Sequence, residues 1–150
     1  MINVWRLASG RYPALAGDGA RIVGGRWNSP GRPFVYTSES LALCLAECLV
    51  HVTGQLPLDY LAFKIAVPRD AIETLASNSL KTGWELDLGQ TRAIGDRWLR
   101  GGRTLALAVP SAVLPESTNV MLNPVYPRAI ELRILSQKRF IFDARLRPIP

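Results

Sequence analysis

The most regular alternation of apolar and polar side chains falls in residues 60–67. One set of alternate positions is wholly apolar and consists of Leu61, Phe63, Ile65 and Val67. The other set contains Lys64 between two alanines. Because successive side chains of a strand point to opposite faces, this period predicts a half-buried strand.

Shorter apolar runs predict further strands. They contain β-branched or aromatic residues, and most are bounded by glycine, proline or polar residues. These runs are residues 4–7, 34–37, 104–109 (ended by Pro110), 119–122, 131–135 and 139–142.

Helical periodicity is clearest over residues 38–52, where Ser38 is a suitable N-cap and Gly54 a suitable stop. Residues 91–99 predict a second helix, closed by Gly101 and Gly102, and residues 70–76 predict a short one. Residues 9–25 are rich in Gly, Ala and Pro and predict a loop with little regular structure.

The order of these elements predicts the fold class. Many strands and two or three helices, without regular βαβ alternation, indicate an α+β protein with mixed or antiparallel sheets flanked by a few helices. A length of 150 residues suits one compact domain over residues 1–150. Neither a Rossmann nor a P-loop glycine pattern is present.

The composition limits the expected cellular location, the state of the cysteines and the kinds of metal site. No run approaches the roughly 20 apolar residues that span a bilayer, and the N-terminus does not resemble a signal peptide, so we expect a cytoplasmic protein without membrane contact. Cys44 and Cys48 are four residues apart on a predicted helix, which suits small core residues better than a disulfide. With His51 as the single histidine, no zinc site and no other metal site is expected.

The chain carries a formal charge of +6, from 18 basic and 12 acidic residues, and arginine dominates the basic set. Arginine forms bidentate contacts to phosphate, which favours a phosphate-bearing ligand. A non-enzymatic nucleic-acid-binding module is an alternative, although the arginines are scattered and no nucleic-acid-binding motif is found. An ordinary arginine-rich surface would give the same charge.

Three residues are candidates for chemistry. Glu47 lies off the centre of an apolar helical stripe made of Leu41, Cys44, Leu45, Cys48, Leu49 and Val52. It can therefore reach the border of a cleft, or it can be a solvated helix glutamate. Arg26 follows two glycines in a turn. It either binds pyrophosphate there or is an ordinary loop arginine. Tyr36 can stack on a flat ring or donate a hydrogen bond, or it belongs to the core with its hydroxyl satisfied.

Taken in order, several motifs resemble the RES domain. They are Trp5-Arg6, Gly25-Arg26-Trp27-Asn28, Val35-Tyr36-Thr37-Ser38-Glu39-Ser40, Ala46-Glu47, Gly95-Asp96-Arg97-Trp98-Leu99, Val109-Pro110-Ser111, Asn119 and Leu122-Asn123-Pro124. The resemblance covers residues from Trp5 to about Pro127, and the arginine, glutamate and serine of the family's name map best to Arg26, Glu47 and Ser111. One departure is Tyr126, where members often have histidine before the proline.

The resemblance implies the toxin of a bacterial toxin–antitoxin pair, with a fold similar to ADP-ribosyltransferase toxins. It implies depletion of NAD⁺ by hydrolysis or phosphorolysis, or in some members ADP-ribosylation of a protein. NAD⁺ would be the substrate, and no true cofactor is expected. The implied partner is an Xre-type helix-turn-helix antitoxin that blocks the active site and supplies any contact with DNA; a homodimer is a further possibility.

The expected roles follow from cleavage of the nicotinamide–ribose bond. Glu47 would stabilise the positive charge that develops on the ribose, Arg26 would bind pyrophosphate, and Tyr36 would flank the nicotinamide. Ser111 is expected to bond Glu47 or the ligand. Asn28 and Asn123 would bind amide or ribose groups, or else stabilise turns. The predicted ligand-binding set is Arg6, Arg26, Trp27, Asn28, Tyr36, Ser38, Ser111 and Asn123.

Overall fold

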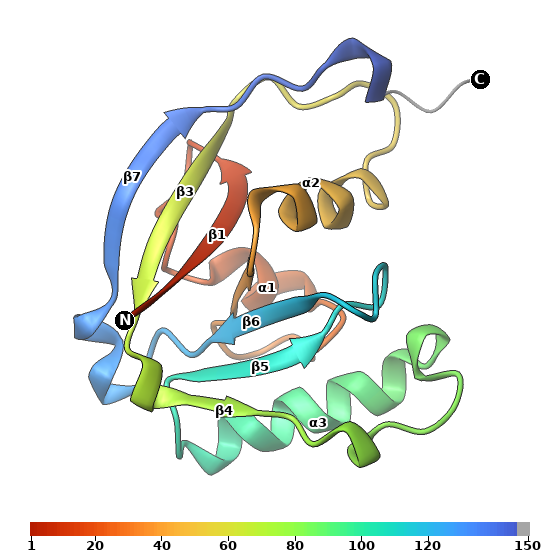
Figure 1. Ribbon diagram of the computed structural model, residues 1–150, viewed down its shortest axis with the longest axis vertical. Coiled ribbons are helices and arrows are strands. Elements are labelled where there is room, and N and C mark those ends of the chain that lie inside the picture. The colour runs from red at the N-terminus through yellow and green to blue at the C-terminus, as the bar shows by residue number, and fades with distance from the viewer. Residues whose placement is uncertain (147–150) are drawn as a thin grey trace.

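The computed structural model describes residues 1–146 as one sheet with three α-helices (Figure 1). Its strands are β1 (Ile2–Ser9), β2 (Val35–Ser38), β3 (Tyr60–Val67), β4 (Ile72–Thr74), β5 (Ala106–Pro110), β6 (Thr118–Leu122) and β7 (Arg133–Arg139). Its α-helices are α1 (Asp18–Val23), α2 (Leu41–Leu49) and α3 (Leu88–Gly101). Short 3₁₀ helices cover Arg69–Ala71, Ser77–Ser79, Trp84–Leu86, Pro127–Glu131 and Ala144–Leu146. The predicted α+β class is confirmed.

The seven strands follow the order β4-β5-β6-β2-β1-β3-β7. All neighbours are antiparallel except β4 and β5, which are parallel. The pairing of β1 with β2 is confined to Trp5 opposite Ser38, whereas β1 and β3 pair along their full length. The sheet therefore bends at this junction, and Figure 1 shows β1, β3 and β7 running across the direction of β4, β5 and β6.

Strand alternation divides the core between two clusters. On β5 and β6, Leu107, Val109 and Met121 face an aromatic cluster under α3, whereas Val120 and Leu122 face the cluster that contains β1 and β3. Both faces of these strands are covered, which explains their continuous apolar sequence. Figure 1 shows α3 along β4 to β6 and α2 on the other side, next to β1.

The observed helices differ from the prediction at several boundaries. The stretch 9–25 was expected as a loop, but it contains α1. The helix expected from residue 38 begins at Leu41, with Ser40 as its cap, because Ser38 extends β2 by pairing with β1 and β6. The same helix ends at Leu49, well before Gly54. Helix α3 is longer than predicted and ends as expected, with Gly102 in the left-handed conformation.

Strand predictions failed where pairing is non-local. Residues 70–76, expected as a helix, form part of a 3₁₀ turn followed by β4, which pairs with β5. The two strands expected over 131–135 and 139–142 are replaced by the single strand β7, in register with β3. β3 has the predicted bounds, but it is not half-buried, because Ala62 and Ala66 on its second face are buried too.

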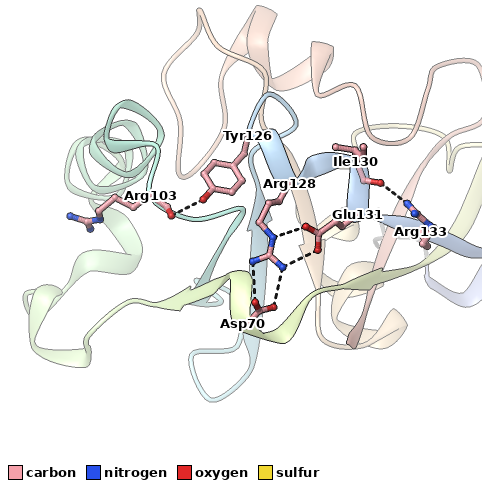
Figure 2. A network of polar contacts seen from close by, with 7 residues as sticks. All are labelled: Asp70, Arg103, Tyr126, Arg128, Ile130, Glu131 and Arg133. Atoms are coloured by element: carbon pink, nitrogen blue, oxygen red, sulfur yellow. Dashed lines mark hydrogen bonds and ion pairs between the residues drawn. The ribbon is translucent and has the colours of Figure 1, made fainter.

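A polar cluster at the edge of the fold joins segments far apart in sequence (Figure 2). The Arg128 guanidinium donates to both carboxylate oxygens of Asp70, at 3.1 and 3.2 Å, and to both of Glu131, at 2.6 and 2.9 Å. Tyr126 donates from its hydroxyl to the carbonyl of Arg103 at 2.9 Å. We call Asp70, Arg128 and Glu131 the Arg128 clamp; it ties the β3–β4 connection to the segment before β7.

Within residues 1–146, none of the helices combines the length and apolar character needed to cross a bilayer.

Candidate active site

A cavity of about 560 Å³ opens where the two halves of the sheet meet. This volume lies within the range of small-molecule sites. Its wall includes six of the predicted site residues: Arg6, Arg26, Trp27, Tyr36, Ser38 and Glu47. One cavity is therefore lined by the side chains that were predicted to carry the chemistry. They come from β1, the loop after α1, β2 and α2.

Glu47 is half-buried near the end of α2, and its carboxylate is held on one side. Its Oε1 accepts hydrogen bonds from Ser111 Oγ at 2.7 Å and from Asn119 Nδ2 at 2.6 Å. The predicted contact between Ser111 and Glu47 is confirmed. The alternative, a freely solvated helix glutamate, is wrong, because the carboxylate accepts two side-chain hydrogen bonds. Within residues 1–146 no donor bonds to Oε2, and Glu47 is one of the residues that line the cavity.

Asn119 is a site residue that sequence reasoning did not assign a role. It stands opposite Ser38 in the β2–β6 pair, and its Oδ1 accepts a hydrogen bond from Ser38 Oγ at 2.7 Å. Its amide thus joins Ser38 to Glu47 in one polar chain. An asparagine at the start of an otherwise apolar strand was the available signal, because a buried polar side chain requires partners.

The loop that carries Arg26 is fastened by Tyr36. The Tyr36 hydroxyl accepts from the backbone N–H of Trp27 at 2.9 Å and donates to Asn28 Oδ1 at 2.7 Å. Burial raises the pKa of Tyr36, which keeps the phenol neutral. A Cβ at Gly25 would overlap the same hydroxyl, so the close approach requires glycine there.

Both arginines of the pocket have buried donors without partners in the described residues, namely Arg6 Nε and Arg26 Nη1. Arg6 also donates from Nη1 to the carbonyl of Tyr36 at 3.0 Å. Burial lowers the pKa of Arg6, but a guanidinium remains charged at neutral pH. A buried donor without a partner costs about 1–3 kcal/mol. Both arginines line the cavity, and their guanidinium groups suit a ligand rich in anionic oxygens.

Three predicted ligand-binding residues do not line the cavity: Asn28, Ser111 and Asn123. Asn28 is fully buried and donates from Nδ2 to the carbonyls of Ala20 and Ser29, at 2.8 and 3.1 Å. Asn123 lies beyond the opposite end of β6 from Asn119 and accepts from the Val125 N–H at 3.2 Å. Both asparagines stabilise turns, which was the alternative. The indole of Trp27, although at the wall, is 1% exposed and packs in the aromatic cluster under α3.

The predicted apolar stripe of α2 is correct at Cys44, but Leu43 outside the stripe is buried as well, and the other stripe members within the helix are only partly buried. Leu43 and Cys44 are its buried residues, and Cys44 donates from Sγ to the carbonyl of Trp5 at 3.0 Å. Cys48 is partly buried and lines the cavity with His51. Both cysteines are free thiols, and burial raises the pKa of each. Residues 1–146 contain no group of three or more His, Cys, Asp or Glu side chains placed to hold a metal ion.

The chain is similar to known proteins over almost its whole length. The family described as "RES domain" matches residues 3–143. The "Prs ADP-ribosylating toxin" of Sphingobium sp. (strain YBL2) is 36% identical over 154 residues, covering 96% of each chain. "Toxin Res" of Pseudomonas putida is 34% identical over 146 residues, covering 95% of this chain and 98% of the relative.

A solved structure has the same fold. A chain of the M. tuberculosis MbcT–MbcA toxin–antitoxin complex superposes with a TM-score of 0.77 over 93% of this chain and 84% of that one, at 22% sequence identity.

Proposed function

Because the chain belongs to the RES domain family, we propose that it is the toxin of a toxin–antitoxin pair and that it cleaves the nicotinamide–ribose bond of NAD⁺. The observation that supports the proposal is the set of charged side chains on the wall of the cavity. Two arginines with buried, unpartnered N–H groups and one restrained carboxylate lie on its wall. This set matches a pyrophosphate joined to a ribose that becomes cationic. The names of the curated relatives, with their reference to toxins and to ADP-ribosylation, support the same class.

The reaction divides between binding and charge stabilisation. Arg6 and Arg26 bind the pyrophosphate oxygens, for which the planar guanidinium is well shaped. The bond between the ribose anomeric carbon and the pyridinium nitrogen breaks heterolytically, and neutral nicotinamide leaves with the bonding pair. The oxocarbenium-like ribose that remains is stabilised by the Glu47 carboxylate.

The second half of the reaction supplies an acceptor. Water attacks the anomeric carbon and loses its proton to Glu47 or to solvent, so the products are ADP-ribose, nicotinamide and a proton. Inorganic phosphate in place of water would give the ribose phosphate ester. In this proposal NAD⁺ is a substrate, and Tyr36 contributes its ring to the wall next to the leaving group, while its hydroxyl holds the loop.

The test is incubation of the purified protein with NAD⁺, with and without phosphate, followed by chromatographic identification of the products. Glu47→Gln should lower the turnover rate by about 10²–10⁴-fold, because the amide cannot stabilise a cation, while binding of ADP-ribose is retained. The matched control is Glu116→Gln, an exposed residue outside the cavity, which should leave turnover unchanged. Intact NAD⁺ after prolonged incubation with wild-type protein would refute the proposal.

A second candidate is ADP-ribosylation of a protein, which the name of the Sphingobium relative favours. The same pocket would serve, with a nucleophilic side chain replacing water. NAD⁺ labelled in its adenosine part, added to a cell extract, would then leave its label on a defined protein band in a Glu47-dependent manner. Labelled ADP-ribose without labelled protein would decide for hydrolysis.

We also propose that an Xre-type antitoxin silences this chain by covering the cavity. A chain with a net charge of +6 and two arginines in its pocket suits an acidic segment or a terminal carboxylate. The structural relative was solved as a toxin–antitoxin complex, which supports an antitoxin as the partner. Co-purification with the cognate antitoxin should abolish binding of ADP-ribose; a complex that still binds ADP-ribose with full affinity would contradict this mode of silencing.

A further inference from the structure

Helix α3 contacts the backbone of the Arg26 loop along one face. Thr91, Arg92, Gly95 and Asp96 follow the spacing of a single helix face, and all four contact the segment 25–29. This face includes the first half of the Gly95-Asp96-Arg97-Trp98 motif, to which neither the cavity nor the proposed chemistry assigns a role.

Three of these helix residues form hydrogen bonds to the loop, at Gly25, Arg26 and Ser29. Thr91 Oγ1 donates to the carbonyl of Arg26 at 2.6 Å, and Arg92 Nε donates to the carbonyl of Gly25 at 2.9 Å. The carboxylate of Asp96 accepts from both the N–H and the hydroxyl of Ser29, at 2.9 and 2.6 Å.

The fourth contact is steric. Gly95 is buried, and a Cβ at this position would overlap the carbonyl of Trp27. The loop backbone therefore lies directly on the helix. On its other side the loop is held by the Tyr36 hydroxyl, so the Arg26 backbone lies between a helix and a strand.

From these contacts we propose that α3 is the positioning element for Arg26, with Thr91 as the residue that fixes its backbone. The inference rests on the proposed function, since it is the pyrophosphate of NAD⁺ that Arg26 binds there. Thr91 does not line the cavity and acts through Arg26, which makes it a positioning residue and not a catalytic one.

The first experiment is a double-mutant cycle with Thr91→Val and Arg26→Ala. Thr91→Val removes the hydroxyl and keeps the shape, and it should raise KM for NAD⁺ about fivefold with kcat nearly unchanged, which is the size of one typical hydrogen bond. Thr91→Ser should restore KM. In the Arg26→Ala background the same substitution should have no further effect, because the group it positions is absent.

The matched control is Thr104→Val. Thr104 accepts a hydrogen bond from Trp98 Nε1 at 2.9 Å, so it also contacts α3, but at the end remote from the Arg26 loop. This variant can lower the melting temperature but should leave KM unchanged. A KM effect of Thr91→Val that persists in the Arg26→Ala background, or that Thr104→Val equals, would overturn the inference.

A second measurement separates this inference from the proposed function. Amide hydrogen exchange of Trp27 and Ser29 should accelerate in Thr91→Val relative to Thr104→Val, whether or not the protein cleaves NAD⁺. Faster exchange in a protein that leaves NAD⁺ intact would retain the positioning role and reject the proposed function. Unchanged exchange at these two amides would reject the positioning role even if NAD⁺ is cleaved.

Discussion

Tyr36 has a structural role in addition to its place in the wall of the cavity. Its hydroxyl is both acceptor and donor, to the Trp27 N–H and to Asn28 Oδ1, and its ring packs against Phe34 with centroids 4.9 Å apart. Because a buried phenol must satisfy its hydroxyl, the residue connects β2 to the loop that carries Arg26.

Replacement of this hydroxyl should therefore affect folding as well as activity. Tyr36→Phe leaves the N–H of Trp27 and the carbonyl oxygen of the Asn28 side chain without a partner, so the free energy of unfolding should fall by about 1–3 kcal/mol. Urea denaturation measures it. Tyr12→Phe, at a tyrosine that is 71% exposed, is the control and should change little. Equal stability of wild type and Tyr36→Phe would show that the hydroxyl contributes nothing.

Connections between elements depend on a few polar contacts at the periphery. The Arg128 clamp joins the 3₁₀ turn before β4, in which only Ala71 is buried, to the 3₁₀ turn before β7, which has no buried residue. The Arg128 guanidinium lowers the pKa of both Asp70 and Glu131. The contribution of exposed ion pairs is small, but here one guanidinium satisfies two carboxylates at once.

The lowered pKa values determine how the clamp depends on pH. Carboxylates whose pKa is lower in the folded protein stabilise it above their unfolded pKa values, and this stability is lost as the pH falls through the folded values. Arg128→Met should therefore melt at a lower temperature than wild type at pH 7, and the difference should shrink below about pH 4. Melting curves across this range test it.

The control for the clamp is Arg100→Met, at an exposed arginine of α3 that has no ion pair among the described residues. Its melting difference from wild type should not change with pH. A difference for Arg128→Met that stays constant down to pH 2 would mean that the loss comes from packing and not from the ion pairs.

The whole chain is organised around the junction between β1 and β2. One half of the sheet contributes Arg6 to the cavity, the other half contributes Tyr36 and Asn119, and the halves are joined in the sheet at a single residue pair. A ligand in the cavity therefore contacts both halves. The candidate site therefore lies at the strand pair with the fewest paired residues in the sheet.

Binding at this junction should stabilise the entire fold. ADP-ribose, at a free concentration of about 100 times its Kd, should add about 2.7 kcal/mol to the free energy of unfolding, because it binds the native state alone. Differential scanning fluorimetry should show one transition at a higher temperature. Arg26→Ala should show a smaller rise at the same ligand concentration. An unchanged melting temperature for wild type would exclude tight binding of ADP-ribose.

Local sequence patterns were sufficient to predict some of the secondary structure and some residues of the candidate site. Alternation located β3 at its observed bounds, and the helical period with Gly102 located the end of α3, because both depend on near neighbours. Motif order grouped Arg26, Tyr36 and Glu47, which line one cavity, and predicted that Ser111 would bond Glu47 or the ligand, of which the bond to Glu47 is observed.

Other features depend on residues distant along the chain. β4 and β7 exist through pairing with β5 and β3, and Ser38 joined a strand instead of capping a helix for the same reason. The role of Asn119 and the unpartnered donors of Arg6 and Arg26 arise only when separate segments meet. Strand pairing and burial are free energies of contact between distant segments, and such contacts leave no period in the sequence of either partner.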